Sequence, residues 1–169
     1  MVLFWGSVAH AAANPDWRVV DDEGRVLYLS APPQRIVSLS PGATAMLFAA
    51  GGGTRIVATA DFSVEPEAAK TIARIGDSHG FDLERILALH PDLIVAWTGG
   101  FSAAQLLPFE RAGLAIYRHR VERLADVPGA IRRFGVLLGT QATAGQRADE
   151  LSGRIAALQV RYRRAYAPR

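Results

Sequence analysis

The sequence predicts an α/β domain built on a doubly wound parallel sheet and ending in a long helix. Three observations predict it. Short β-branched runs alternate with helical segments along the chain, these runs are apolar throughout, and glycines follow the helices. Half of the 169 residues are apolar and 21% are charged. This composition supports a packed core.

Composition excludes several classes of protein. The chain has no cysteine, which removes a disulfide scaffold, a thiol nucleophile, a cysteine zinc site and a lipid-modified cysteine. No apolar run reaches the roughly 18 to 20 residues that a membrane span needs.

The positive net charge of +3 is concentrated near the end of the chain, where six arginines in residues 145–169 face only Asp149 and Glu150. A nucleic-acid-binding protein would carry a basic patch with stacking aromatics, so we expect no nucleic-acid partner.

Residues 1–13 are apolar and small, and they predict the remnant of a signal peptide. Small side chains at Ala9, Ala11 and Ala13 suit signal peptidase. The basic start of a signal peptide is missing, so a disordered extension is the alternative. The favoured expectation is a soluble periplasmic protein with an α/β lobe over 14–140.

The first half of that lobe has clear local signals. Residues 17–29 predict a β-hairpin with Gly24 in its turn. A short strand over 35–39 is followed by Ser40 and Pro41, a favoured N-cap and first helical residue. The resulting helix over 41–50 ends at three glycines, and a second strand is expected over 55–60.

The second half repeats this alternation. A helical turn is expected at 65–70, helices over 82–89, 102–112 and 126–138, and strands over 92–97 and 114–117. Pro91, Gly113 and Gly139 mark the helix ends.

The last segment, 141–169, is expected to form a long helix that opens at a capping box over 143–146 and runs to about Tyr166. Leu151, Ile155, Leu158 and Tyr162 form an apolar stripe along it. Such a stripe must pack on something, part of which lies outside this chain.

Two aromatic side chains come directly after predicted strands. Phe62 follows the second strand, and Trp97 follows the third, with Gly99 and Gly100 beside it. Open α/β sheets bind ligands outside the carboxyl ends of their strands. An indole with two glycines offers a flat apolar wall to a bulky ligand. The alternative is that both aromatics only pack the sheet.

Catalytic motifs are weak. Residues 76–78 match a Gly-Asp-Ser hydrolase motif, but no Asp-x-x-His supplies its base. The four histidines have no metal-ligand spacing, and His79 is expected to be a polar surface residue of a loop, with a metal or haem-iron ligand as the alternative. The glycines at 51–53 follow a helix and are not a dinucleotide loop. We therefore expect no enzyme, no metal site and no cofactor.

Three segments carry a family resemblance: Arg-Ile-Val-Ser-Leu-Ser-Pro-Gly-Ala-Thr over 35–44, the turn over 21–25, and the stretch over 82–97. They resemble the substrate-binding proteins of ABC transporters for cobalamin, iron-siderophores and haem. The resemblance implies a monomer that captures a small molecule and delivers it to a membrane permease and its ATPase.

Residues 96–100 are most similar to the cobalamin-binding branch of that family. The resemblance implies that Trp97 lines a corrinoid pocket and that Phe62 falls near a pocket tyrosine. A second pocket tryptophan of the branch would fall near Ser78 or His79, and this sequence has none there. Ferric siderophore or haem therefore remains the alternative ligand.

The family has two lobes joined by a long helix, and this chain resembles the first lobe and that helix. By this resemblance Glu84 docks on permease arginines, whereas the plain alternative is a solvated carboxylate in the first turn of a helix. Half a pocket predicts weak ligand binding by residues 1–169. A single-lobe module that docks on a permease without ligand is the alternative of a different class.

Overall fold

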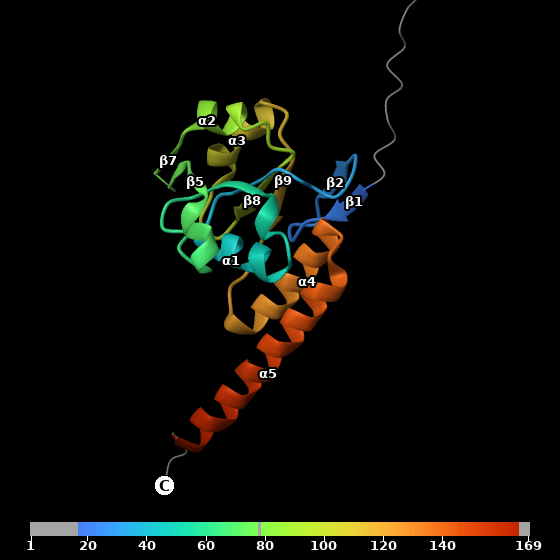
Figure 1. Ribbon diagram of the computed structural model, residues 1–169, viewed down its shortest axis with the longest axis vertical. Helices are drawn as coiled ribbons and strands as arrows, with labels where there is room; N and C mark the ends of the chain where they lie inside the picture. The colour runs from blue at the N-terminus through green and yellow to red at the C-terminus, as the bar shows by residue number, and fades with distance from the viewer. Residues whose placement is uncertain (1–16, 78, 166–169) are drawn as a thin grey trace, which may run out of the picture.

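A five-stranded parallel sheet forms the centre of the computed structural model, which describes residues 17–77 and 79–165 (Figure 1). The expected signal segment and Ser78 lie outside these residues. The strands run in the order β5-β4-β3-β8-β9. Their bounds are β3 Ile36–Ser38, β4 Ile56–Thr59, β5 Ala73–Arg74, β8 Leu93–Trp97 and β9 Ile116–His119.

Helices cover both faces of the sheet, which confirms the doubly wound α/β prediction. They are α1 Pro41–Ala49, α2 Leu83–Ala88, α3 Ala103–Arg111, α4 Val127–Leu138 and α5 Gln141–Ala165, with 3-10 turns η1 Gly53–Arg55, η2 Glu67–Thr71 and η3 Leu124–Asp126. Figure 1 shows α2 and α3 on one face and α1 and α4 on the other.

The helix starts follow the capping signals of the sequence. The Ser40 hydroxyl accepts from the Ala43 backbone N–H (3.3 Å), and the Asp82 carboxylate accepts from Arg85 N–H (2.9 Å). Ser102 and Gln105 form a reciprocal capping box at α3. Each cap satisfies backbone donors that would otherwise be free.

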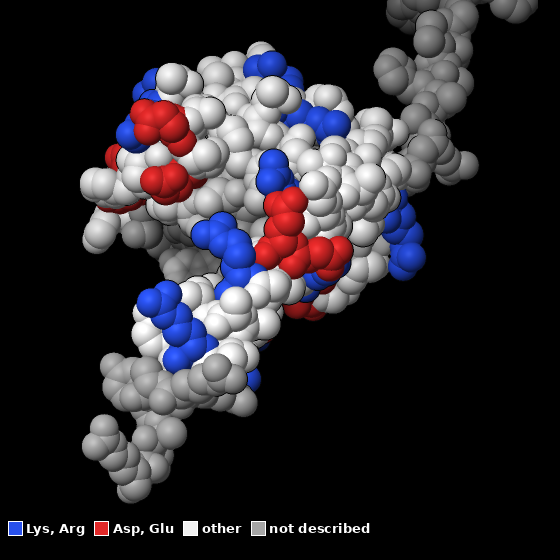
Figure 2. Space-filling model, turned by 60° about the horizontal axis from the view of Figure 1, so that its bottom comes forward, with Lys and Arg blue, Asp and Glu red and all other residues white. Residues whose placement is uncertain are grey.

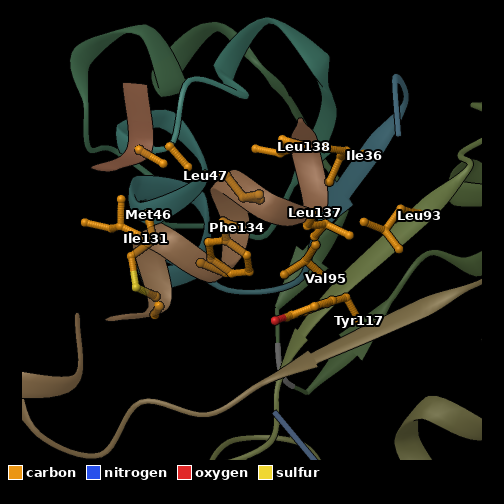
Figure 3. Packing of buried hydrophobic residues seen from close by; sticks show 14 of the residues in the cluster. Ile36, Met46, Leu47, Leu93, Val95, Tyr117, Ile131, Phe134, Leu137 and Leu138 are labelled. Atoms are coloured by element: carbon orange, nitrogen blue, oxygen red, sulfur yellow. The ribbon is translucent and has the colours of Figure 1, made fainter. Parts of the chain in front are cut away.

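The larger of two apolar clusters lies between the sheet and α4 (Figure 3). Phe134 and Leu137 of α4 pack against Val95 and Tyr117, which project from neighbouring strands. The Tyr117 and Phe134 rings lie 5.6 Å apart between centroids. A second cluster, with Ile86, Leu106 and Phe109 among its members, fills the opposite face.

The leading hairpin, β1 Trp17–Val20 and β2 Val26–Leu29, is tied to this body by specific contacts. The Trp17 indole N–H donates to the Leu137 carbonyl (3.0 Å). The Asp22 carboxylate accepts from the backbone N–H of Arg120 (2.8 Å) and from the Arg133 guanidinium (3.0 Å). The hairpin turn is thereby fixed beside the end of β9.

Three expectations about local elements were wrong in detail. The structure has an additional strand β5 and a small hairpin, β6 Gly76–Asp77 with β7 Gly80–Phe81. Strand β9 ends at His119, two residues later than expected. Helix α5 starts at Gln141, because Gly139 alone ends α4 in a left-handed conformation (φ 70°); the expected capping box at 143–146 is inside the helix.

Helix α5 packs along α4 and then extends past it (Figure 1). Ala144, Ala148 and Ile155 are buried. Beyond them, Leu158 and Tyr162 are 48% and 57% exposed. None of the described helices is long and apolar enough to cross a bilayer.

Candidate functional site

The chain reverses its order of strands between β3 and β8. It builds β3, β4 and β5 outward in one direction, then returns to place β8 on the other side of β3. Open parallel sheets bind ligands at such a switch point, outside the carboxyl ends of the strands. Here that position is occupied by Ser40 and Pro41 after β3 and by Trp97 at the end of β8.

The side chain of Trp97 is 37% exposed. Its indole N–H donates to the Val121 carbonyl (3.3 Å), which orients the ring across the end of β9. A Cβ added at Gly99 would lie 2.4 Å from the ring, and one added at Gly100 would lie 2.6 Å from it. The two glycines therefore let the turn after β8 fold onto the indole itself.

Three hollows adjoin this indole. The first, called the Phe62 hollow, has a volume of about 330 Å³ and is lined by residues that include Pro41, Phe62, His79, Trp97 and Phe101. The second, called the His119 hollow, has a volume of about 260 Å³ and is lined by Ser40, Pro41, Gly42, Met46, Trp97, His119 and Val121. The third, about 410 Å³, lies between Trp97 and Arg120. One exposed aromatic ring thus forms a wall of each.

Phe62 projects from the loop after β4 with 77% of its surface exposed. Its backbone is left-handed (φ 63°), a conformation that non-glycine residues adopt rarely and that costs about 1–3 kcal/mol. It packs into neither apolar cluster. The exposed ring and the strained backbone together present an apolar side chain to the Phe62 hollow.

His79 lies across the same hollow, at the turn of the β6–β7 hairpin. Its backbone N–H donates to Asp77 Oδ1 (2.8 Å), which holds the pKa of that carboxyl below its usual range. The imidazole Nδ1 lies 3.2 Å from the same oxygen. The structure therefore brings Phe62, His79 and Trp97 together with Gly99 and Gly100 at one edge of the sheet.

A buried hydroxyl network supports the loops at this edge. Thr44 Oγ1 donates to Ser38 Oγ (2.9 Å) and lies 2.6 Å from Thr59 Oγ1, which in turn lies 2.8 Å from Ser63 Oγ. The network joins the ends of β3 and β4 to α1. Satisfied buried networks of this kind hold a single geometry, so the edge is preorganised.

His119 is the residue of this edge that the sequence analysis missed. It ends β9, is only 2% exposed and lines the His119 hollow. Neither ring nitrogen has a hydrogen-bond partner among the described residues. Desolvation by burial lowers its pKa to about 4. A search for metal-ligand spacing could not find His119. The signal that could have identified it is an ionisable residue near the carboxyl end of a predicted strand.

The other predicted site residue, Glu84, is exposed in the first turn of α2. It follows the β6–β7 hairpin directly in the chain and lines none of the three hollows beside Trp97. Within the described residues no group of three or more histidine, aspartate or glutamate side chains could hold a metal ion.

Hollows of similar size lie elsewhere, one of about 420 Å³ between β2 and β9. Volume alone therefore does not locate a site. The switch point and the exposed aromatics favour the edge at Trp97. Figure 2 shows acidic and basic side chains mostly in mixed groups, without one broad basic patch on the face in view.

Comparison with known proteins gives a consistent result. The family model described as periplasmic binding protein matches residues 36–167. A vitamin B12-binding protein of Vibrio vulnificus (strain CMCP6) is 38% identical over 105 residues, 62% of this chain and 38% of the relative. That of Pectobacterium atrosepticum is 35% identical over 127 residues, 75% of this chain and 46% of the relative.

Two solved structures share the fold and a recognisable sequence. The periplasmic vitamin B12-binding protein BtuF of Vibrio cholerae superposes with a TM-score of 0.71 at 30% identity, covering 78% of this chain and 51% of that one. The periplasmic haem-binding protein RhuT of Roseiflexus sp. RS-1 has the same TM-score at 27% identity, covering 80% and 52%. The chain thus spans about half the length of these relatives.

Proposed function

The chain belongs to the periplasmic binding protein family, and from this premise we propose that it contributes one face of a corrinoid-binding site in an ABC importer. The observation that carries the proposal is the exposed Trp97, which borders three hollows at the switch point of the sheet. A cobalamin-like ligand is flat, bulky and largely apolar across its ring. An indole beside adjoining hollows suits such a ring better than a small polar solute.

In this proposal the ligand lies against Trp97 and Phe62, with Gly99, Gly100 and His79 at the rim. No covalent chemistry takes place. The relatives named as vitamin B12-binding proteins, 30–38% identical to this chain, support a corrinoid as the ligand. Haem is the second candidate, because a haem-binding structure at 27% identity matches the fold equally well.

The proposal extends to the partners. The relatives are about twice as long as the matched region. A part that corresponds to their unmatched half would supply a second face and enclose the ligand from the opposite side. The exposed apolar end of α5, with Leu158 and Tyr162, would contact that part. Glu84, exposed on α2, would then orient the loaded protein on arginines of the permease, where rim charges affect encounter more than affinity.

The test is a titration of the chain with cyanocobalamin and, separately, with haemin. We expect saturable but weak cyanocobalamin binding, with a dissociation constant in the micromolar range or higher, because residues 1–169 supply one face of the proposed site. Trp97→Ala should abolish it. Tyr28→Ala is the control, since Tyr28 is an exposed aromatic on β2 (61% exposed) that lines none of the three hollows beside Trp97. No saturable binding, or equal binding by the Trp97 variant, would overturn the proposal.

A further inference from the structure

His119 occupies an uncommon position for a histidine. It is buried at the end of β9, where its ring and that of Phe134 pack edge to face at a centroid distance of 5.5 Å. Both ring nitrogens lack a hydrogen-bond partner among the described residues. Buried polar side-chain atoms are nearly always paired, and an unpaired one costs the fold about 1–3 kcal/mol. A residue that serves stability alone would not be an imidazole here.

The ring forms part of the wall of the His119 hollow, whose other walls are mainly Pro41, Met46, Trp97 and Val121. Two other polar side-chain groups line this hollow. One is the Ser40 hydroxyl, and the other is the Trp97 indole N–H, which already donates to the Val121 carbonyl. Rotation of an imidazole about its Cβ–Cγ bond exchanges nitrogen and carbon positions. A half-turn of the ring therefore puts a nitrogen where a ring carbon lay, so that the edge that lines the hollow can present a nitrogen to a group in it.

The charge state limits what that group can be. The Asp22 carboxylate favours protonation of the imidazole and the Arg133 guanidinium opposes it, but desolvation outweighs both and lowers the pKa of His119 to about 4. At neutral pH the ring is uncharged and offers one donor and one acceptor. An amide or hydroxyl matches this pair, whereas a carboxylate gains no ion pair and must still be desolvated.

We propose that His119 is a specificity-determining residue that hydrogen-bonds a neutral amide or hydroxyl group of the ligand inserted into the His119 hollow. The inference rests on the proposed function and deepens it. Corrinoids carry amide side chains around their ring, and haem carries carboxylates. His119 therefore favours the corrinoid over haem at this face.

The experiment compares His119→Leu with His119→Gln in the full chain, with cyanocobalamin and haemin as probes. We expect His119→Leu to weaken cyanocobalamin binding about tenfold, because one buried hydrogen bond is lost. His119→Gln, which keeps a donor and an acceptor, should stay within about twofold of the wild type. Haemin binding should change little in either variant.

Stability separates this role from a structural one. Removal of an unpaired buried nitrogen should leave the midpoint of urea unfolding of His119→Leu unchanged or raised. Equal cyanocobalamin affinity in both variants and the wild type would overturn the inference and leave the proposed function intact. Absence of saturable cyanocobalamin binding by the wild type would overturn both. Haemin binding that depends on His119 would also overturn the inference.

Should His119→Leu fail to fold, imidazole ¹⁵N resonances of the wild type give a second readout. On addition of cyanocobalamin a nitrogen of His119 should shift. His90, which lies at the opposite end of the strands just before β8, should not. Perturbation of the Trp97 indole without any shift at His119 would refute the inference alone.

Discussion

Gly99→Ala should move the indole of Trp97 without unfolding the protein. The new Cβ would lie 2.4 Å from Cζ2, 2.5 Å from Cε2 and 2.9 Å from Nε1 of that ring. Carbon atoms pack at about 3.5–4.0 Å, so the ring must shift by roughly an ångström. The bond from Nε1 to the Val121 carbonyl is already 3.3 Å long and would break.

The effect on stability should be small. Loss of one half-exposed hydrogen bond costs about 0.5–1.5 kcal/mol. Gly99 does not have a left-handed φ, so alanine recovers about 0.4–1 kcal/mol through the unfolded state. The free energy of unfolding should therefore change by less than about 1 kcal/mol. Cyanocobalamin binding should weaken about tenfold, since the loss of a well-placed aromatic contact costs about 1.5 kcal/mol of binding free energy.

The assay is the pair of indole N–H resonances of Trp97 and Trp17, followed with urea unfolding and a cyanocobalamin titration. The Trp97 resonance should move and that of Trp17 should not. Gly80→Ala is the matched control, because a Cβ there meets nothing within 4 Å. An unmoved Trp97 resonance would refute the packing argument. A moved resonance with unchanged affinity would refute the role of the indole in binding.

Three further predictions concern stability. The pKa of His119 is about 4 in the folded protein and about 6.5 in the unfolded chain. Between pH 6.5 and pH 4 the unfolded chain therefore binds more protons than the folded protein. The free energy of unfolding should fall by up to about 3 kcal/mol as the pH is lowered over this range. His119→Leu should lack that slope in urea titrations, and an equal slope would contradict the assignment. Asp92→Ala removes the acceptor of two backbone N–H groups before β3 (2.7 and 3.0 Å) and should cost about 1–3 kcal/mol, whereas Asp92→Asn should cost less; no loss would contradict the anchor. Gly135→Ala places a Cβ 2.4 Å from Ala144 Cβ and should cost about 1–3 kcal/mol in thermal unfolding, against a small gain for Gly145→Ala, where nothing lies within 4 Å.

Local sequence signals predicted most of the fold. The cap at Ser40 predicted the start of α1, the expected helices over 82–89 and 102–112 match α2 and α3 to within a residue, and apolar runs located β3, β4 and β8. Strand β5 was missed because two residues, one of them Arg74, show no periodicity. The start of α5 was misplaced because Thr143 resembles a cap, although a left-handed Gly139 already ends α4.

The candidate site was predictable in part, because two of its residues directly follow predicted strands. Parallel strands bring their carboxyl ends to one edge, so Phe62 and Trp97 could be placed together from their positions alone. His119 was missed because β9 was expected to end at 117, and because its burial against Phe134 depends on a contact with a separate helix. The contact of the two glycines with the indole likewise depends on the path of the turn after β8.

The central claim is that the carboxyl edge of the sheet at Trp97 receives the ligand. The most direct measurement is a cyanocobalamin titration followed through the indole N–H resonances, assigned with Trp97→Phe. Trp17, bound to the Leu137 carbonyl beneath the hairpin, is the internal reference. The account predicts a saturable shift of the Trp97 resonance with Trp17 unmoved. Saturable binding that leaves Trp97 unmoved, or no binding at all, would contradict it.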